Sequence, residues 1–216
     1  MENQIQVIQQ ADVLAAINSS EIDSQVATAH RFPRDVGKAL KKIEMLACAD
    51  EETASDCFYV LRRNGAGGES TIEGLSIRMA EIIASSWGNL RVQARIINND
   101  GKYITAQGVC HDLESNYAVS KEVKRRITDR SGRTYSDDMQ TVTGNAACAI
   151  AMRNAVLAVV PKAVTNAIVK RVRQKAMGKS LDVVASRQTM IMYFAKLGVT
   201  TDQLCTYLGI GSVDEI

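Results

Sequence analysis

The sequence has little of what marks a secreted, metal-binding or membrane-spanning protein. Its 216 residues include only two prolines, two histidines and five cysteines. The cysteines are irregularly spaced with no C-x-x-C pair, which predicts reduced core residues and neither disulfides nor a zinc site (Cys48, Cys57, Cys110, Cys148 and Cys205). No apolar run approaches the roughly 20 residues of a membrane span, and the start, MENQIQVIQQ, lacks the features of a signal peptide. We therefore expect a cytoplasmic protein without a metal or cofactor.

The sequence motifs of nucleotide-dependent and hydrolytic enzymes are missing as well. The glycine-rich stretch at 65–70 has Glu69 where a phosphate-binding loop needs its lysine. No G-x-G-x-x-G stands between a strand and a helix, and neither a nucleophile elbow nor H-E-x-x-H occurs. These absences favour a protein that is not an enzyme and has no catalytic residues.

What the chain does have is an uneven distribution of charge. Residues 1–60 carry ten acids and five bases, whereas residues 120–180 carry thirteen bases and four acids, a balance of 13 − 4 = +9. The formal net charge of +2 conceals this contrast. A basic segment in a chain with 46% hydrophobic residues is typical of a folded protein that binds nucleic acid.

The hydrophobic pattern in the first part of the chain predicts helices. Residues 9–62 have helical spacing, and Pro33 is expected to start a second helix there. Arg62–Ser70 is predicted to be a flexible loop because of its glycines. Ile72–Trp87 is predicted to be a helix that ends at Gly88-Asn89.

From Leu90 the pattern alternates, which predicts strands. A first strand leads into Asn98–Gly101, a strong hairpin-turn signal, and Lys102–Cys110 is the expected returning strand. Tyr117–Ile127 is predicted to be a third strand, with Lys124 and Arg126 on the side opposite its valines.

The rest of the chain reads as helical. Gln140–Val160 is rich in small residues and is expected to pack closely on the sheet until Pro161 divides the helix. Two short helices follow near the end, at about 182–197 and 201–208, the second capped by Thr200. The predicted fold is α+β: helices around a small three-stranded antiparallel sheet with a long following helix, as a core over 1–180, and a small helical appendage over 181–216.

Several cations are candidates for binding single-stranded nucleic acid, which needs a basic groove and planar rings. Seven are predicted on the sheet and its turns, near Tyr103, Tyr117 and Tyr135: Arg95, Lys102, Lys124, Arg125, Arg126, Arg130 and Arg133. The alternative is a solvated basic face with tyrosines in the core.

Two further groups of cations leave alternatives open. Arg153 lies in a small, apolar helix and needs a partner, either a carboxylate such as Glu81 or a phosphate. The run from Lys170 to Lys175 is either a solvated helix face or a DNA contact.

One short pattern resembles a metal-dependent nuclease. Asp112 and Glu114, followed by Glu122-Val123-Lys124, match a carboxylate and E-x-K arrangement, in which carboxylates hold magnesium and a lysine stabilises the attacking group. A magnesium-dependent nuclease using Asp112, Glu122 and Lys124 is therefore an alternative function, and a phage structural or assembly protein is another.

The order of the predicted elements resembles the core of phage single-strand annealing proteins, the RecT, Redβ and Erf-like recombinases. Four segments between residues 70 and 208 carry the resemblance: GLSIRMAE (74–81), WGN (87–89), TGNAACAIAMRNAV (143–156) and FAKLGVT (194–200).

The resemblance implies a non-catalytic protein that coats single-stranded DNA and anneals complementary strands without ATP. It also implies a ring or helical filament of many copies inside a bacterial host, with a phage exonuclease and a host single-strand-binding protein as partners. Carried onto this chain, it assigns the DNA groove to Arg95, Lys102, Lys124, Arg125, Arg126 and Arg153. The N-terminal helical region is expected to serve oligomerisation, with its acidic residues docking on a neighbour's basic surface.

Overall fold

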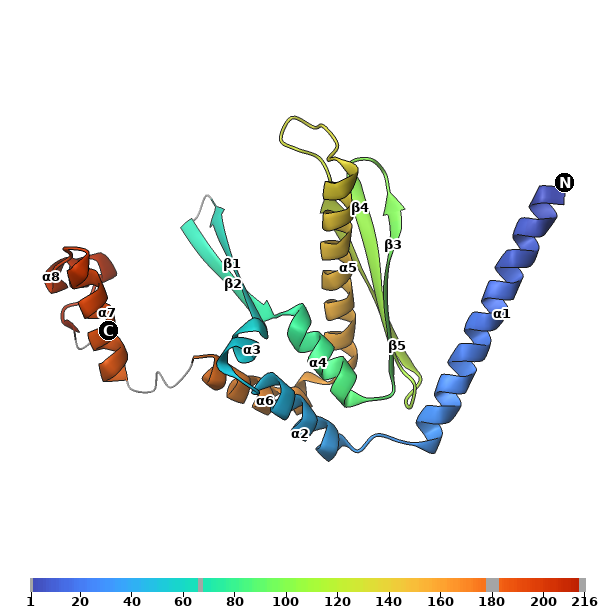
Figure 1. Ribbon diagram of the computed structural model, residues 1–216, viewed down its shortest axis with the longest axis horizontal. Helices are drawn as coiled ribbons and strands as arrows, with labels where there is room; N and C mark the ends of the chain where they lie inside the picture. Colours follow the sequence, from blue (N-terminus) through green and yellow to red (C-terminus); the bar gives the residue numbers. More distant parts are fainter. Residues whose placement is uncertain (1, 66–67, 178–182, 214–216) are drawn as a thin grey trace.

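The computed structural model describes residues 2–65, 68–177 and 183–213, and its fold is α+β (Figure 1). A two-stranded antiparallel hairpin pairs β1 (Phe58–Gly65) with β2 (Gly68–Leu75). A three-stranded antiparallel sheet follows in the order β3 (Leu90–Asn99), β4 (Tyr103–Asp112) and β5 (Tyr117–Arg126). The helices are α1 (Glu2–Arg31), α2 (Val36–Ala47), α3 (Glu51–Asp56), α4 (Ile77–Trp87), α5 (Asp137–Val159), α6 (Lys162–Ala176), α7 (Val183–Lys196) and α8 (Thr201–Leu208).

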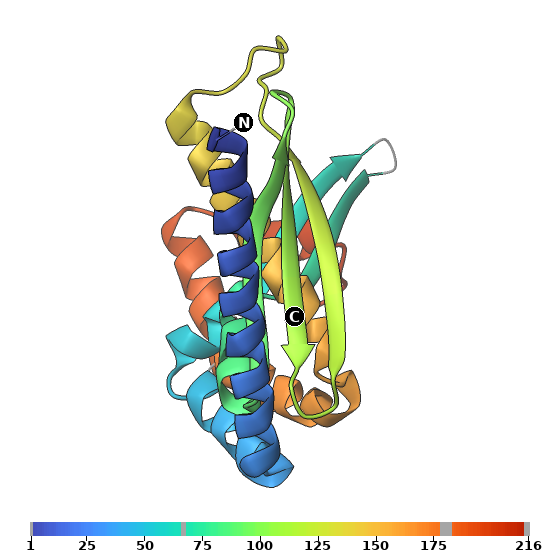
Figure 2. The same cartoon turned by 90° about the vertical axis from the view of Figure 1, so that its right-hand side faces the viewer.

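The three-stranded sheet has one face covered by α5 and one face open. The register places Val92, Ala106 and Val123 on the covered face, as the alternation predicted. The opposite face looks toward α1, which leaves the body at an angle, as Figures 1 and 2 show. The open face is polar, so the sheet is half-buried, as expected of an antiparallel sheet with one solvated side.

The long helix α5 approaches β4 very closely because small residues meet at the contact. Ala147, Ala151 and Ala155 are fully buried along one side of α5. Opposite them, β4 carries Gly108, where an added Cβ would lie 2.3 Å from the carbonyl carbon of Ala151. The backbones are therefore in direct contact, and Gly108 is the residue that permits it.

Two hydrophobic clusters meet along α5. The smaller lies between α5 and the sheet and contains Ile104 and Ile127. The larger joins α2, α4 and α6 to the C-terminal half of α5, with Ile43, Ile83 and Ile168 among its buried side chains. Since α5 contributes to both clusters, it holds the sheet and the helical layer together.

The structure corrects the predictions for the first part of the chain. The hairpin takes up the end of the stretch predicted to be helical (58–62), the predicted loop at 62–70 and the start of the helix predicted from Ile72. Residues 66–67 lie outside the described residues. The helix α4 begins only after Ser76, whose hydroxyl accepts the N–H of Met79. Pro33 does not start a helix, because Asp35 caps α2 by accepting the N–H of Lys38 at 3.0 Å.

The predictions for the second part are confirmed. The turn between β3 and β4 lies at residues 100–102, and Pro161 separates α5 from α6. Thr200 caps α8 through a capping box with Gln203. In Figure 1, α7 and α8 lie apart from the rest. The boundary predicted near residue 180 falls in 178–182, outside the described residues, and stays a prediction.

The cysteines are free in the structure. Cys57 and Cys110 are buried, and burial raises the pKa of both thiols to about 11. These two are inert core residues at neutral pH, whereas Cys48, Cys148 and Cys205 are only partly buried, so the predicted core position is confirmed for two of the five cysteines.

Contrary to the sequence expectation, α5 is long and apolar enough to cross a membrane. Of the described helices it alone passes this test, and 33% of the stretch is buried in the structure. Core helices of soluble proteins share these properties, so length and composition do not identify a membrane span here.

A methyl group at Gly108 should force α5 away from β4. We expect Gly108→Ala to lower the free energy of unfolding by about 1–3 kcal/mol or more, because overpacking against backbone has no flexible side chain to absorb it. Gly144→Ala is the matched control, since its Cβ would lie 3.5 Å from the side chains of Ile96 and Ile104, an ordinary contact. Urea denaturation should show Gly144→Ala unchanged or stabilised by about 0.5–1 kcal/mol through helix propensity. Equal destabilisation of both variants would contradict the close approach at Gly108.

Candidate nucleic-acid interface

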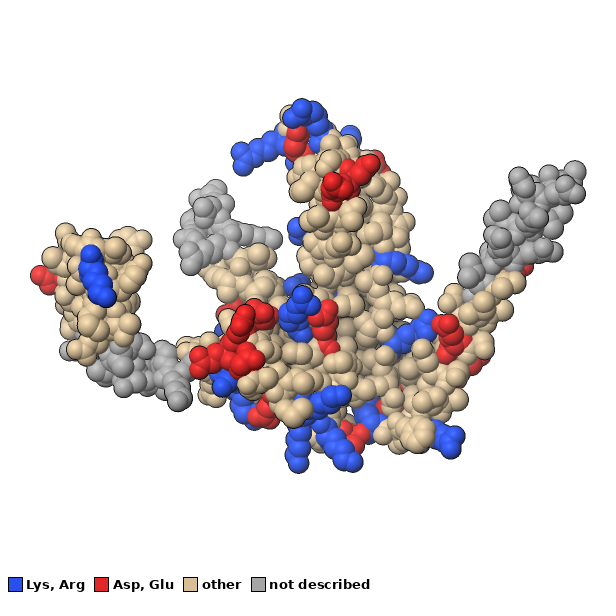
Figure 3. All heavy atoms as spheres, viewed as in Figure 1, with Lys and Arg blue, Asp and Glu red and all other residues tan. Residues whose placement is uncertain are grey.

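Six of the eight predicted cations lie together at one end of the three-stranded sheet, here called the basic tip. Lys102 is in the β3–β4 turn, three residues end β5, and two are in the loop from β5 to α5: Lys102, Lys124, Arg125, Arg126, Arg130 and Arg133. Hydrogen bonds join the two loops, from the N–H of Ile127 to the carbonyl of Lys102 (2.9 Å) and from Thr134 Oγ1 to the carbonyl of Gly101 (2.8 Å). Figure 3 shows lysine and arginine side chains gathered at this end of the molecule.

The carboxylates of the basic tip shape the backbone. Asp129 accepts hydrogen bonds from the Ser131 hydroxyl (2.6 Å) and the Arg133 N–H (2.9 Å), which hold its pKa below the usual value. Asp100 accepts the N–H groups of Tyr103 and Lys102, which lower its pKa in the same way. Both loops are therefore folded around an ionised aspartate.

The acids near the basic tip offset most of its positive charge. Its six bases face Asp100 and Asp129 in the loops and Asp137 and Asp138 in the first turn of α5, an excess of 6 − 4 = +2. The last two acids lie at the positive end of the helix dipole, which they offset. Each of the four acids thus has a structural role in the loops or the helix end.

The cations of the basic tip differ in how firmly they are held. Arg126 donates to Thr128 Oγ1 (2.6 Å) and to the carbonyl of Asp129 (2.7 Å). Arg133 pairs with Asp129 at 3.1 Å, although its side chain is 83% exposed. The side chains of Arg125 and Arg130 are exposed and have no partner among the described residues. These two are the most available for an external anion.

The open face of the sheet continues from the basic tip. Lys124 lies over the ring of Tyr103, with its Nζ 4.4 Å from the centroid, and pairs with Asp100 at 3.8 Å. Further along, Arg95 donates to Gln107 Oε1 at 3.1 and 3.3 Å. Arg125 points to the other face, because its strand partner is the buried Ile104.

Two of the three predicted tyrosines, Tyr103 and Tyr135, lie at the basic tip, but only Tyr103 is exposed there. Tyr103 is 39% exposed beside Lys124. Tyr117 is at the far end of β5, and Tyr135 packs against the cluster around Ile127. The basic tip therefore offers one exposed ring for stacking.

Arg153 lies away from the basic tip and has no carboxylate partner among the described residues. Glu81, the predicted one, pairs instead with Arg78 at 3.0 Å. The guanidinium of Arg153 rests on the ring of Tyr59 in β1 (4.7 Å) and donates to Asn154 Oδ1 (3.1 and 3.3 Å). At about 1.5 Å per residue, Arg153 is roughly 24 Å along α5 from its first turn. It links α5 to the hairpin, and its second predicted role, contact with a phosphate, stays a prediction.

The cations of the run from Lys170 to Lys175 are partly structural. Arg171 Nη2 donates to Glu44 Oε2 of α2 at 2.7 Å. Arg173 pairs with Glu73 of β2 and covers the ring of Phe58 at 4.8 Å. These two arginines fasten α6 to its neighbours.

The nuclease-like residues are not brought together. Asp112 lies on the α5 side of β4, whereas Glu122 is on the open face and pairs with Gln107, five residues away from Asp112. At about 3.4 Å per residue this separates them by roughly 17 Å along the strands. Across the described residues, no group of three histidine, cysteine or acidic side chains could hold a metal ion.

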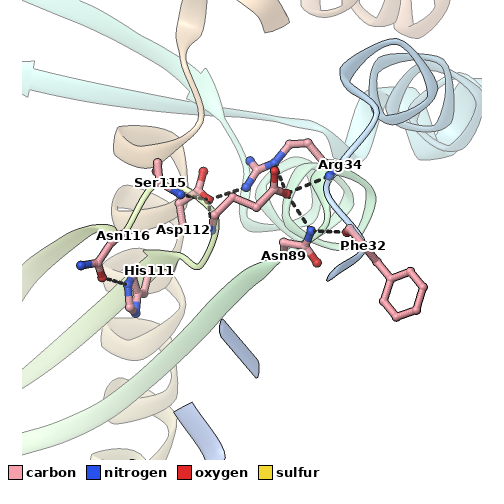
Figure 4. Close-up of polar contacts among 8 residues, drawn as sticks. Phe32, Arg34, Asn89, His111, Asp112, Ser115 and Asn116 are labelled. Atoms are coloured by element: carbon pink, nitrogen blue, oxygen red, sulfur yellow. Dashed lines mark hydrogen bonds and ion pairs between the residues drawn. The ribbon is translucent and has the colours of Figure 1, made fainter. Parts of the chain in front are cut away.

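Asp112 and Glu114 instead form an ion-pair network with Arg34, shown in Figure 4. Arg34 pairs with Asp112 and donates from Nε to Glu114 Oε1 at 2.8 Å, with only 8% of its side chain exposed. Asn89, at a positive φ of 52°, donates to the same glutamate oxygen (2.7 Å) and to the carbonyl of Phe32 (2.9 Å). The network fixes the α1–α2 connection to the start of β3 and the β4–β5 turn.

The charges in this network depend on one another. Burial alone would raise the pKa of both carboxyls, but hydrogen bonds from Arg34 to Asp112, and from Asn89 and Arg34 to Glu114, hold both below their usual values. The carboxylates likewise raise the pKa of Arg34 against the effect of its burial. Sequence reasoning missed Arg34 and Asn89. The only local signal was the asparagine directly after Gly88, because asparagine adopts a positive φ more readily than most residues, as Asn89 does.

We expect Arg34→Ala to lower the free energy of unfolding by about 3–5 kcal/mol at pH 7, because it leaves two carboxylates partly buried without their cation. The folded pKa values are lowered, so the stabilisation is complete above the unfolded values of about 4 and is lost as the pH falls through the folded ones. Urea denaturation should therefore show the difference from the parent narrowing below about pH 4. The control is Arg31→Ala, whose guanidinium is near a phenylalanine ring and in no ion pair among the described residues. A difference that is independent of pH would contradict the role of the ion pairs.

Comparison with known proteins adds no relative: no family model matches the chain, and no curated protein or solved structure matches it.

Proposed function

We propose that this protein binds single-stranded DNA through its basic tip and promotes ATP-independent annealing of complementary strands. The convergence of six cations from two loops and a strand end supports the proposal most directly. Arginine and lysine side chains on ordered loops are suited to phosphates, which accept charge-assisted hydrogen bonds.

The basic tip is better suited to binding a single strand than to reading the base sequence of a duplex through its groove. Base-specific reading of a duplex usually inserts a helix or a β-ribbon into the major groove. The basic tip offers exposed cations and the ring of Tyr103 instead, the combination that holds single strands by phosphate contact and stacking. Contacts to phosphates leave base edges free for a second strand.

Annealing by such a surface requires positioning and no covalent chemistry. Two strands repel each other through their phosphates, and cations that neutralise some of this charge favour their pairing. In this proposal several copies act along one strand as a ring or filament, with the acidic N-terminal region against a neighbour's basic surface. A phage exonuclease and a host single-strand-binding protein are the proposed partners.

Binding should depend on salt through the free cations of the basic tip. Replacing Arg125 and Arg130 by alanine should weaken binding of a labelled oligothymidylate and reduce the slope of log affinity against log salt by about 1.4, at about 0.7 per lost phosphate contact. Arg126 is left in place because it holds the loop. The matched control is Lys41→Ala with Lys42→Ala, two exposed cations of α2. Fluorescence anisotropy over a salt series measures the slope, and an unchanged slope in the Arg125/Arg130 variant would remove the basic tip from the interface.

Annealing should occur without ATP or magnesium and leave strand length unchanged. Labelled complementary oligonucleotides report duplex formation and strand length in the same reaction, and the Arg125/Arg130 variant should anneal more slowly than the parent. Magnesium-dependent cleavage that is abolished by Glu122→Gln would favour the nuclease instead. Neither binding nor annealing at about 50 mM salt, where phosphate contacts are strong, would favour a structural or assembly role.

A further inference from the structure

An apolar cavity of about 330 Å³ lies where the base of the hairpin meets α5 and α6. Its walls come from five elements and are formed mainly by aliphatic and aromatic side chains: Phe58, Leu75, Ile83, Leu157, Val160 and Val169. A cavity of roughly 150 Å³ is enough to hold benzene, so this one has room for a large side chain.

Several of these walls are only half-buried in the chain by itself. Phe58, Leu75, Leu157 and Val169 belong to the edge of the larger hydrophobic cluster and keep part of their apolar surface open. Covering that apolar surface would favour a complex through the hydrophobic effect.

Within the part of the chain that the structure describes, the rim of the cavity carries one unpaired cation, Lys162, and an arginine, Arg173, whose charge is offset by Glu73. Lys162 and Arg173 line it, Asn166 lies between them, and α6 has no acidic residue from Lys162 to Ala176. Arg173 is held in place by Glu73 and by the ring of Phe58. The side chain of Lys162 is exposed and has no partner among the described residues, so it is available to a carboxylate.

We propose that this cavity is a docking site for an acidic peptide segment of another protein, with one large apolar side chain inserted and carboxylates on either side. The cavity selects the apolar side chain by its volume, and Lys162 on the rim, with no acidic residue on α6 to compete, selects a carboxylate by charge. A phosphate chain alone would leave the apolar walls unfilled.

The docking site is separate from the basic tip. Leu157 is 20 residues after Asp137 on α5, or about 30 Å along the helix. The peptide site therefore does not rest on the proposed function, and either can fail without the other.

The test uses a short labelled peptide in which one phenylalanine stands between aspartates and glutamates. The full chain should bind it saturably with a Kd on the order of 10–100 µM, as measured by fluorescence anisotropy. A peptide with alanine for phenylalanine should not bind, and one with lysines for the acids should bind at least ~10-fold more weakly.

Two protein variants probe the two features of the site separately. Val169→Trp should fill the cavity and abolish binding, and Lys162→Glu, an exposed change with little risk to folding, should weaken binding by ~10-fold. Lys102→Glu at the basic tip is the matched charge reversal and should leave peptide binding intact. Conversely, Lys162→Glu should leave the slope of log affinity against log salt for oligonucleotide binding the same as in the parent protein.

Three outcomes would overturn the proposal. The first is no binding of the phenylalanine peptide up to about 1 mM. The second is binding that neither Lys162→Glu nor Val169→Trp changes while both variants unfold as the parent does. The third is a change in oligomeric state, by light scattering, in the cavity variants, which would make a second copy of the chain the occupant.

Discussion

The direct contact of α5 with β4 is the constraint on which the other features depend. Gly108 allows the backbone of Ala151 to lie against the strand, and the alanines around it keep the helix close over several turns. The N-terminal end of α5 then receives the loop from β5 and closes the basic tip. Its C-terminal half supplies Arg153 to the hairpin and Leu157 to the apolar cavity. A shift of α5 would therefore alter three surfaces together, because interiors packed this densely transmit displacement.

The use of acidic residues explains how a chain with little net charge presents basic surfaces. Asp100 and Asp129 fold loops, Glu44 and Glu73 hold arginines of α6, and Asp112 and Glu114 enclose Arg34. These carboxylates are engaged by particular hydrogen bonds, whereas Arg125, Arg130 and Lys162 have no partner in the described part of the chain. Basic surfaces form here because the acids are used to fold loops and join elements, and not because the chain has a large excess of bases.

The sequence predicted the sheet and α5 because their signals are local. Strict alternation from Leu90, a turn at Asp100-Gly101 and a run of small residues before Pro161 each constrain the backbone within a few residues. The hairpin of β1 and β2 lacks such a signal, since Phe58–Leu61 does not alternate and the glycines beyond it also suit a loop. Its pairing is fixed by contacts such as the ring of Tyr59 over Gly74, which only the folded chain reveals.

The candidate site could be predicted in part for the same reason. Cations at a predicted turn and strand end were expected to converge, and they do. The network of Arg34 was out of reach, because its partners Asp112 and Glu114 are 78 and 80 residues away in the chain. The sequence pattern of these two carboxylates suggested a metal site because it gives no sign that Arg34 pairs with both of them. Spacing can indicate that two acids are close, but their chemistry depends on the groups that surround them in space.

In the proposed function, the distance between Arg153 and the basic tip restricts how one DNA strand would contact both. A strand that contacts Arg130 and Arg153 would have to follow α5 for more than 20 Å, past the edge of β5. On that path it would meet Lys121 and Arg125, which the register places on the α5 side of β5. A strand on the open face would meet Lys124 and Arg95 instead, on the side of the sheet opposite α5 and Arg153. The two faces of the sheet thus define two alternative paths, and Arg125 and Lys124, adjacent in sequence, belong to different ones.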